Sequence, residues 1–294
     1  MDRPAVVEEW ARQGRYVGVS GHQLFALTIG ETSPRAAVLL HGFPGSSFDW
    51  SHVARQVGER IAVVTFDLLG YGLSDKPDIR YSIFDEADLA TEVIARSGVE
   101  RCVLIAHDLG DTVAAELLAR ANEGRLPFEV ERTILTNGSI FIDLAQLSAG
   151  QRVLLSLPDE RMDTGFGADG LGAGLAETFS KERPPADEDF EALVWLAVRE
   201  DGDLLLPRLI RYIEERRANQ DRFTAAFVDH PAPLTLLWGE QDPIAVLEMT
   251  RLMKNLRPDT EVVTWPDLSH WPSLEDPQRV AAAIVERLGG DTAG

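Results

Sequence analysis

The chain has 294 residues and is 45% hydrophobic, which is enough to bury a sizeable core, and we expect one domain with an insert. Its formal net charge of −20 excludes a nucleic-acid partner, because binding to a phosphate backbone needs a basic surface. It has no apolar run long enough to cross a bilayer, no secretion signal and a single cysteine, so we expect a cytoplasmic protein without membrane association, disulfides or a cysteine metal site.

The first part of the chain predicts a sheet. Residues 16–30, YVGVSGHQLFALTIG, alternate around Gly21 and indicate an antiparallel hairpin at one sheet edge. From Arg35 to about Asn137, short apolar runs alternate with amphipathic stretches such as Ser82 to Ser97, as is typical of a parallel sheet with crossover helices. The predicted class is therefore α/β, with a mostly parallel, doubly wound sheet.

The pattern changes between Ser139 and His230. A glycine-rich run, GFGADGLGAG, and a proline-rich run, KERPPADEDF, lie beside helical stretches, chiefly FEALVWLAVRE and LLPRLIRYIEERRANQDRF. The sheet pattern resumes at PLTLLWGEQDP and TEVVTWPDLSHW, and a closing helix is expected from Gln278 to Leu288. We predict a helical cap at residues 139–230, inserted into a core formed by residues 1–138 and 231–294.

Reactive side chains follow three of the predicted strands. In a doubly wound sheet, ligands bind at the carboxyl ends of the strands. Asp108 lies in AHDLG, a variant of the sharp strand-to-helix turn G-x-nucleophile-x-G, in which small residues flank an exposed nucleophile. Asp242 and His270 follow later strands and complete the chain order of nucleophile, acid and histidine.

An aspartate at this turn predicts a different reaction from a serine. An ionised carboxylate is suited to displacement at a saturated carbon, which forms an alkyl ester on Asp108. His270, oriented by Asp242, would then activate a water molecule that hydrolyses the ester. The backbone N–H groups of Leu109 and of Phe43, in HGFPG, would bind the resulting oxyanion.

Simpler roles compete with several of these assignments. Asp108 alone also fits the N-cap of the following helix, although this role does not explain His270. Asp242 precedes a proline and fits a turn equally by composition. Tyr212 is either a core residue of a cap helix or a catalytic group, and Trp195 either packs in the cap or holds a leaving group.

The motifs HGFPGSSFDW, FDLLGYGLSDKP, HDLGDTVAAELL and LSHWPSLEDP together resemble the α/β-hydrolase superfamily. The resemblance is to its aspartate-nucleophile branch of epoxide hydrolases and haloalkane dehalogenases, and within that branch to the subgroup of mesoderm-specific transcript-like hydrolases. It implies an α/β-hydrolase fold with an inserted cap, a small-molecule substrate, water as co-substrate, and no cofactor or metal ion. It does not predict the oligomeric state.

The resemblance also separates two reactions. Dehalogenases of this branch have a tryptophan after the nucleophile and an asparagine in the HG-x-P loop, both of which donate to halide, whereas this chain has Leu109 and Phe43. Epoxide hydrolases share the HGFP loop and use cap tyrosines as proton donors, and RYIEERR resembles such a segment at Tyr212. We therefore expect an epoxide hydrolase first, a dehalogenase with an atypical halide site that includes Trp195 second, and a ligand-binding homologue without turnover third.

Overall fold

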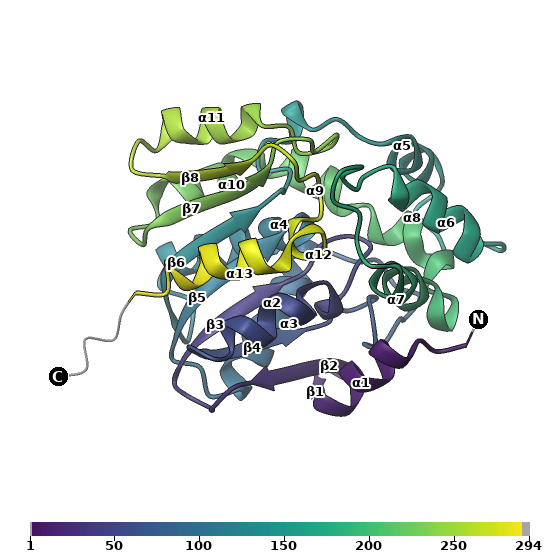
Figure 1. Ribbon diagram of the computed structural model, residues 1–294, viewed down its shortest axis with the longest axis horizontal. Coiled ribbons are helices and arrows are strands. Elements are labelled where there is room, and N and C mark those ends of the chain that lie inside the picture. The colour runs from purple at the N-terminus through teal and green to yellow at the C-terminus, as the bar shows by residue number, and fades with distance from the viewer. Residues whose placement is uncertain (1, 290–294) are drawn as a thin grey trace.

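A computed structural model describes residues 2–289 and is built around one eight-stranded sheet (Figure 1). The strand order is β1-β2-β4-β3-β5-β6-β7-β8, and β2 runs antiparallel to both of its neighbours while the later strands are parallel. Met1 and residues 290–294, which we assigned to the core, lie outside the described residues. The strands are β1 (Arg15–Val19), β2 (His22–Ile29), β3 (Arg35–Leu40), β4 (Ala62–Phe66), β5 (Arg101–His107), β6 (Glu129–Thr136), β7 (Leu234–Gly239) and β8 (Glu261–Trp265).

Helices cover both faces of this sheet, because its central strands are apolar on both sides. In β3, Ala36, Val38 and Leu40 belong to one hydrophobic core, and Ala37 and Leu39 belong to the core on the opposite face. The first core also contains residues of α3 (Ile83–Arg96), α4 (Leu109–Asn122), α10 (Gln220–Asp229) and α11 (Glu248–Leu256). The second contains residues of α1 (Ala5–Gln13), α2 (Ser51–Val57) and α13 (Pro277–Val285).

The predicted fold class is confirmed. The hairpin at residues 16–30 forms β1 and β2 at the sheet edge, with Val19 opposite His22. The amphipathic stretch from Ser82 to Ser97 is α3, whose N-terminus is capped by the Ser82 side chain. Short helices connect the remaining elements, namely the 3₁₀ helix η1 (Ser47–Trp50) and the single turn α12 (Pro272–Glu275).

The regular elements between β6 and β7 are helices joined by loops, and much of this segment lies beyond one end of the sheet (Figure 1). The long helical stretch at residues 205–223 is divided in the structure, because Asn219 leaves the helical region with φ −119°. The last helix, α10, packs on α4, which covers one face of the sheet, and Arg222 of α10 binds Glu116 of α4. The other elements of the segment are η2 (Ile142–Leu144), α5 (Ala149–Ser156), α6 (Gly167–Ala176), α7 (Asp187–Val198), η3 (Arg199–Leu205), α8 (Leu206–Leu209) and α9 (Tyr212–Ala218).

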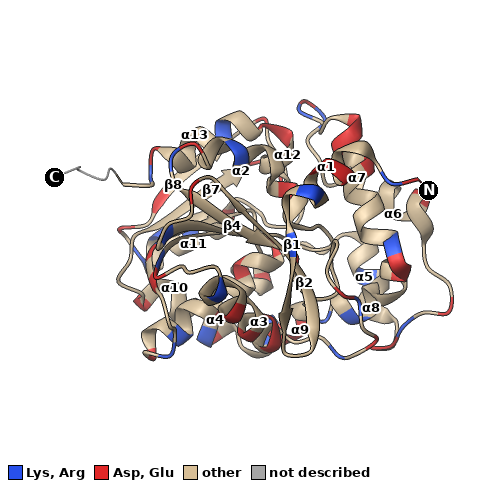
Figure 2. Ribbon diagram, turned by 90° about the horizontal axis from the view of Figure 1, so that it is seen from below, with Lys and Arg blue, Asp and Glu red and all other residues tan. Residues whose placement is uncertain are grey.

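Acidic and basic residues are interspersed along the outer helices and loops (Figure 2). Many arginines form ion pairs with this acidic surface, as Arg35 does with Glu131 at 2.6 Å. Among the described residues, no helix is both long enough and apolar enough to span a bilayer.

Candidate active site

Asp108 lies at a strained turn between β5 and α4. Its backbone has φ 50° and ψ −111°, a conformation that non-glycine residues rarely adopt, and the Asp111 N–H donates to its carbonyl at 3.1 Å. The turn brings α4 close to β3, so a Cβ atom added at Gly110 would lie 2.7 Å from the Leu40 carbonyl oxygen. This close approach explains the small residue that the motif requires after the nucleophile position.

Two backbone N–H groups act on the Asp108 carboxylate. The Phe43 N–H donates to Asp108 Oδ2 at 2.9 Å, and the Leu109 N–H also stabilises the ionised form. Burial raises the pKa of Asp108, whose side chain is almost inaccessible, while His270 and these two N–H groups counteract part of the rise. The two residues predicted to form an oxyanion hole are therefore brought to the carboxylate.

His270 and Asp242 form a buried pair beside Asp108. The distance from His270 Nδ1 to Asp242 Oδ2 is 2.9 Å, and the same oxygen accepts a hydrogen bond from Asn137 Nδ2 at 2.8 Å. Asp242 Oδ1 accepts the N–H groups of Ile244 and Ala245 at 2.7 and 3.0 Å, so the carboxylate is held from both sides. Asn137, at the end of β6, therefore helps to hold Asp242, which lies in the loop after the neighbouring strand β7.

Opposing effects set the pKa of His270. Burial lowers it, but the charge and hydrogen bond of Asp242, together with the charge of Asp108, outweigh burial and raise the pKa to about 9. At neutral pH the resting imidazole is therefore protonated, and the charges of both Asp242 and Asp108 favour this form.

Glu275, which we did not assign from the sequence, and His107, which we expected to have a structural role, hold the loop of His270. Glu275 accepts the N–H groups of Ser269 and Ser180 at 2.6 and 2.9 Å, and His107 Nε2 donates to the His270 carbonyl oxygen at 2.7 Å. Both lie in motifs quoted above, LSHWPSLEDP and HDLGDTVAAELL. Their long-range hydrogen bonds leave no periodic signal in the sequence.

The two cap candidates differ in position. The Tyr212 hydroxyl lies 3.4 Å from each oxygen of the Asp108 carboxylate and is the donor in both contacts. Trp195 instead packs against the core that contains α1 and α2, with the guanidinium groups of Arg3 and Arg199 about 6 Å from its ring. It is not among the residues that line the cavity at His270.

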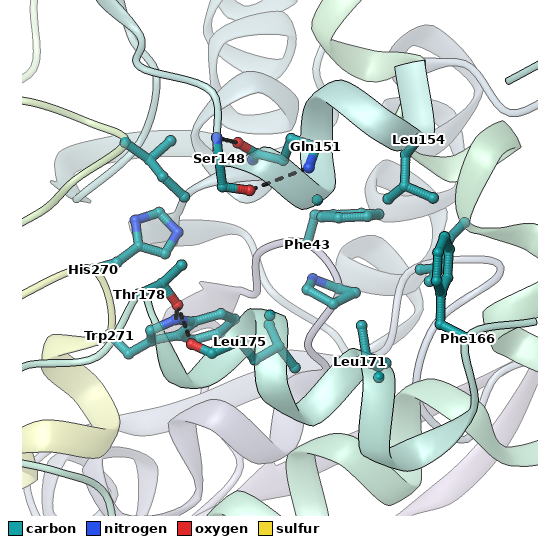
Figure 3. A pocket seen from close by; sticks show the side chains of 16 residues that line it. Phe43, Ser148, Gln151, Leu154, Phe166, Leu171, Leu175, Thr178, His270 and Trp271 are labelled. Atoms are coloured by element: carbon teal, nitrogen blue, oxygen red, sulfur yellow. Dashed lines mark hydrogen bonds between the residues drawn. The ribbon is translucent and has the colours of Figure 1, made fainter. Parts of the chain in front are cut away.

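A mainly apolar cavity of about 120 Å³ opens beside the site (Figure 3). His270 lies on one side of the cavity, Phe166, which is 42% exposed, lies on the opposite side, and Phe43 lies between them. A second, smaller cavity of about 10 Å³ is lined by Leu109 and Tyr212, among others. Asp108 lines neither cavity, because its contacts with Phe43 and Tyr212 cover the carboxylate. The larger cavity is lined by Phe43, Pro44, Ser148, Gly150, Gln151, Leu154, Phe166, Gly170, Leu171, Gly174, Leu175, Thr178, Leu206, Ile244, His270 and Trp271.

This fold and this arrangement of residues define a hydrolase. Residues 37–283 match the model of the alpha/beta hydrolase family, and the chain belongs to that family. It is 36% identical over 283 residues to a putative hydrolase, LipZ, of Mycobacterium tuberculosis, covering 96% of this chain and 98% of the relative. It is also 32% identical over 286 residues to the mesoderm-specific transcript protein of Mus musculus, covering 92% and 84%, which confirms the predicted likeness to that protein.

Solved structures support the fold. A haloalkane dehalogenase variant, DbeA-M1, from Bradyrhizobium elkanii superposes with a TM-score of 0.76 at 20% identity, covering 94% of this chain and 95% of the other. A putative aryl esterase from Burkholderia cenocepacia superposes with a TM-score of 0.75 at 21% identity, covering 94% and 97%. Because the neighbours carry different activities at low identity, they establish the architecture, and the reaction has to be argued from the site.

Proposed function

We propose that the protein hydrolyses small, uncharged epoxides through an ester on Asp108, with residues 139–230 acting as a cap. The observation that carries the proposal is the set of groups around one carboxylate. Asp108 receives a hydrogen bond from the Phe43 N–H at 2.9 Å and faces the Tyr212 hydroxyl at 3.4 Å, beside the His270–Asp242 pair. A nucleophile, a proton donor and a base are therefore contiguous.

In the first step, an Asp108 oxygen attacks a ring carbon and forms a C–O ester bond. The C–O bond of the epoxide breaks, its electron pair remains on the ring oxygen, and that oxygen takes the proton of the Tyr212 hydroxyl. A poor leaving group needs such a donor. Because Tyr212 covers the carboxylate at rest, an entering substrate has to displace this contact and occupy the space between the two side chains.

In the second step, His270 removes a proton from water, and the resulting hydroxide adds to the Asp108 ester carbonyl. Before this step the imidazolium of His270 gives its proton through solvent to the Tyr212 phenolate, because esterification removes the negative charge of Asp108, one of the causes that raise the pKa of His270. The Phe43 and Leu109 N–H groups are placed to bind the oxyanion. Collapse releases the diol and the free carboxylate and leaves His270 protonated, as it is at rest.

The cavity indicates the kind of substituent that the epoxide carries. Of the residues lining the cavity, only His270 is ionisable near neutral pH, and leucine and aromatic side chains form much of the wall. Charged substrates would lose their hydration there without compensation, so we expect alkyl or aryl epoxides. The dehalogenase alternative invokes an indole donor at Trp195, which is not among the residues that line this cavity.

The test is to trap the ester in a His270→Gln variant. Incubation with styrene oxide or 1,2-epoxyhexane should raise the intact mass by one substrate equivalent, on the peptide that contains Asp108. Asp108→Asn provides the matched control, because it preserves side-chain shape and should acquire no mass. If wild-type enzyme hydrolyses an epoxide while His270→Gln never acquires mass, the ester mechanism is wrong. If neither wild type nor variant reacts but unchanged ligand binds, the chain is a binding homologue.

A further inference from the structure

Arg216 is a fully buried cation beneath the proposed site. It lies on α9, and no part of its side chain reaches solvent. Its Nη1 donates to Thr112 Oγ1 at 2.7 Å and its Nη2 donates to the Ile140 carbonyl oxygen at 2.8 Å. Its guanidinium also lies 5.7 Å from the centre of the Phe223 ring. Because burying a guanidinium costs free energy, we expect this arginine to have a specific role.

The contacts of Arg216 form a matched pair with those of Tyr212. Tyr212 and Arg216 are one helical turn apart on α9, and Asp108 and Thr112 are one turn apart at the start of α4. Tyr212 faces Asp108, and Arg216 binds Thr112. Two successive turns of α9 therefore contact two successive turns at the start of α4. The position of the Tyr212 hydroxyl is therefore coupled to the anchor at Arg216.

The ionisable groups that face the guanidinium are all at this site. They are Asp111 of α4, Asp108 at the turn, and Tyr212 of the same helix. Asp111 is fully buried, and neither of its carboxylate oxygens has a hydrogen-bond partner in the described part of the chain. Burial raises the pKa of Asp111 well above its usual range, with Arg216 opposing that rise, and burial lowers the pKa of Arg216 to about 10. The guanidinium therefore remains charged at neutral pH.

We propose that Arg216 is a positioning residue, which holds α9 against α4 so that the Tyr212 hydroxyl meets Asp108, and which presents a fixed positive charge to both. The inference rests on the proposed function for the role of Tyr212. Burial and the charge of Asp108 raise the pKa of Tyr212, whereas Arg216 lowers it. Loss of the guanidinium therefore both displaces the proton donor and makes its proton harder to release.

A double-mutant cycle tests this coupling. Tyr212→Phe should slow the first chemical step by about 100-fold, within the range for loss of a general acid. Arg216→Met should slow it by a similar factor, and the double variant should be no more than about threefold slower than either single variant, because both remove one function. Arg216→Lys keeps the charge but loses the fork, and should recover about tenfold of the lost rate.

Arg222→Met is the matched control. Arg222 lies on the next helix and also binds α4, through Glu116 at 2.7 and 3.0 Å, but away from Asp108. It should stay within about threefold of wild type and combine additively with Tyr212→Phe. Full additivity between Arg216→Met and Tyr212→Phe would overturn the proposal, as would equal effects of Arg216→Met and Arg222→Met.

A second measurement is independent of turnover. Amide hydrogen exchange should become at least tenfold faster in the α9 peptide of Arg216→Lys, while Arg222→Met accelerates exchange in α10 only. The lysine variant keeps the charge and is the safer variant to fold. Unchanged exchange in α9 would overturn the anchoring role, even if epoxides prove to be the wrong substrates. The kinetic cycle depends on turnover of styrene oxide, whereas the exchange measurement needs no turnover, so the anchoring role can be decided even when the epoxide reaction fails.

Discussion

The backbone N–H of Phe43 donates to Asp108 Oδ2 at 2.9 Å, across 65 residues of sequence. A loop after β3 thereby supplies a hydrogen bond to a carboxylate at the end of β5. In the proposed reaction, the same N–H group serves the nucleophile at rest and the oxyanion of the ester intermediate later. The site is preorganised around the negative charge of Asp108, and burying that charge costs free energy of folding.

Asp108→Asn should abolish turnover and at the same time stabilise the protein. Burial raises the pKa of Asp108, which means that the ionised form is disfavoured in the folded state at neutral pH. Asparagine keeps the shape and an acceptor for Phe43 but carries no charge. The free energy of unfolding at pH 7 should rise by on the order of 1 kcal/mol, measured by urea denaturation. A variant less stable than wild type at pH 7 would show that the charge itself holds the turn together.

His270 should make stability depend on pH in the alkaline range. Its pKa is raised from 6.5 to about 9, so the protonated form is favoured by folding. The contribution is fully present below pH 6.5 and is lost as the pH rises through about 9. Relative to a His270→Gln variant, wild type should lose up to about 3 kcal/mol between these limits. Parallel stability curves for the two proteins from pH 6 to 10 would contradict the raised pKa.

Tyr212→Phe should slow esterification by about 100-fold while leaving hydrolysis of the ester unchanged, because the hydroxyl serves only the departing ring oxygen. Rapid-quench measurements of the two steps separate these effects. Tyr81→Phe is a suitable control, since the Tyr81 hydroxyl donates to the Pro77 carbonyl oxygen at 2.6 Å and should not affect either step. Equal slowing of both steps in Tyr212→Phe would instead indicate a general disturbance of the site.

The sequence predicted the convergence of Asp108, Asp242 and His270, because parallel strands place their carboxyl ends at one edge of the sheet. The directions of the two cap candidates were not predictable in the same way. Tyr212 reaches Asp108 because the helical stretch is broken and α9 is anchored separately at Arg216, whereas helical periodicity assigns Trp195 only to a face, not to a partner. Support from Asn137 and Glu275 depends on pairings 105 and 95 residues apart, which local patterns do not encode.

Phe166 should determine how strongly kcat/KM increases with the length of the alkyl chain on the epoxide. It lines the cavity on the side opposite His270, and 42% of its surface is exposed, so a short epoxide bound at His270 should not reach it, whereas a longer alkyl chain should (Figure 3). Burying each methylene against the wall is worth about 0.8 kcal/mol, or roughly fourfold in kcat/KM. Phe166→Ser should therefore reduce kcat/KM by about fivefold to tenfold for 1,2-epoxydecane and by less than twofold for 1,2-epoxybutane. Leu256→Ser removes an apolar side chain of similar exposure, 46%, from α11 and should change neither value. A uniform loss over all chain lengths in Phe166→Ser would show that the substrate does not extend toward this side of the cavity.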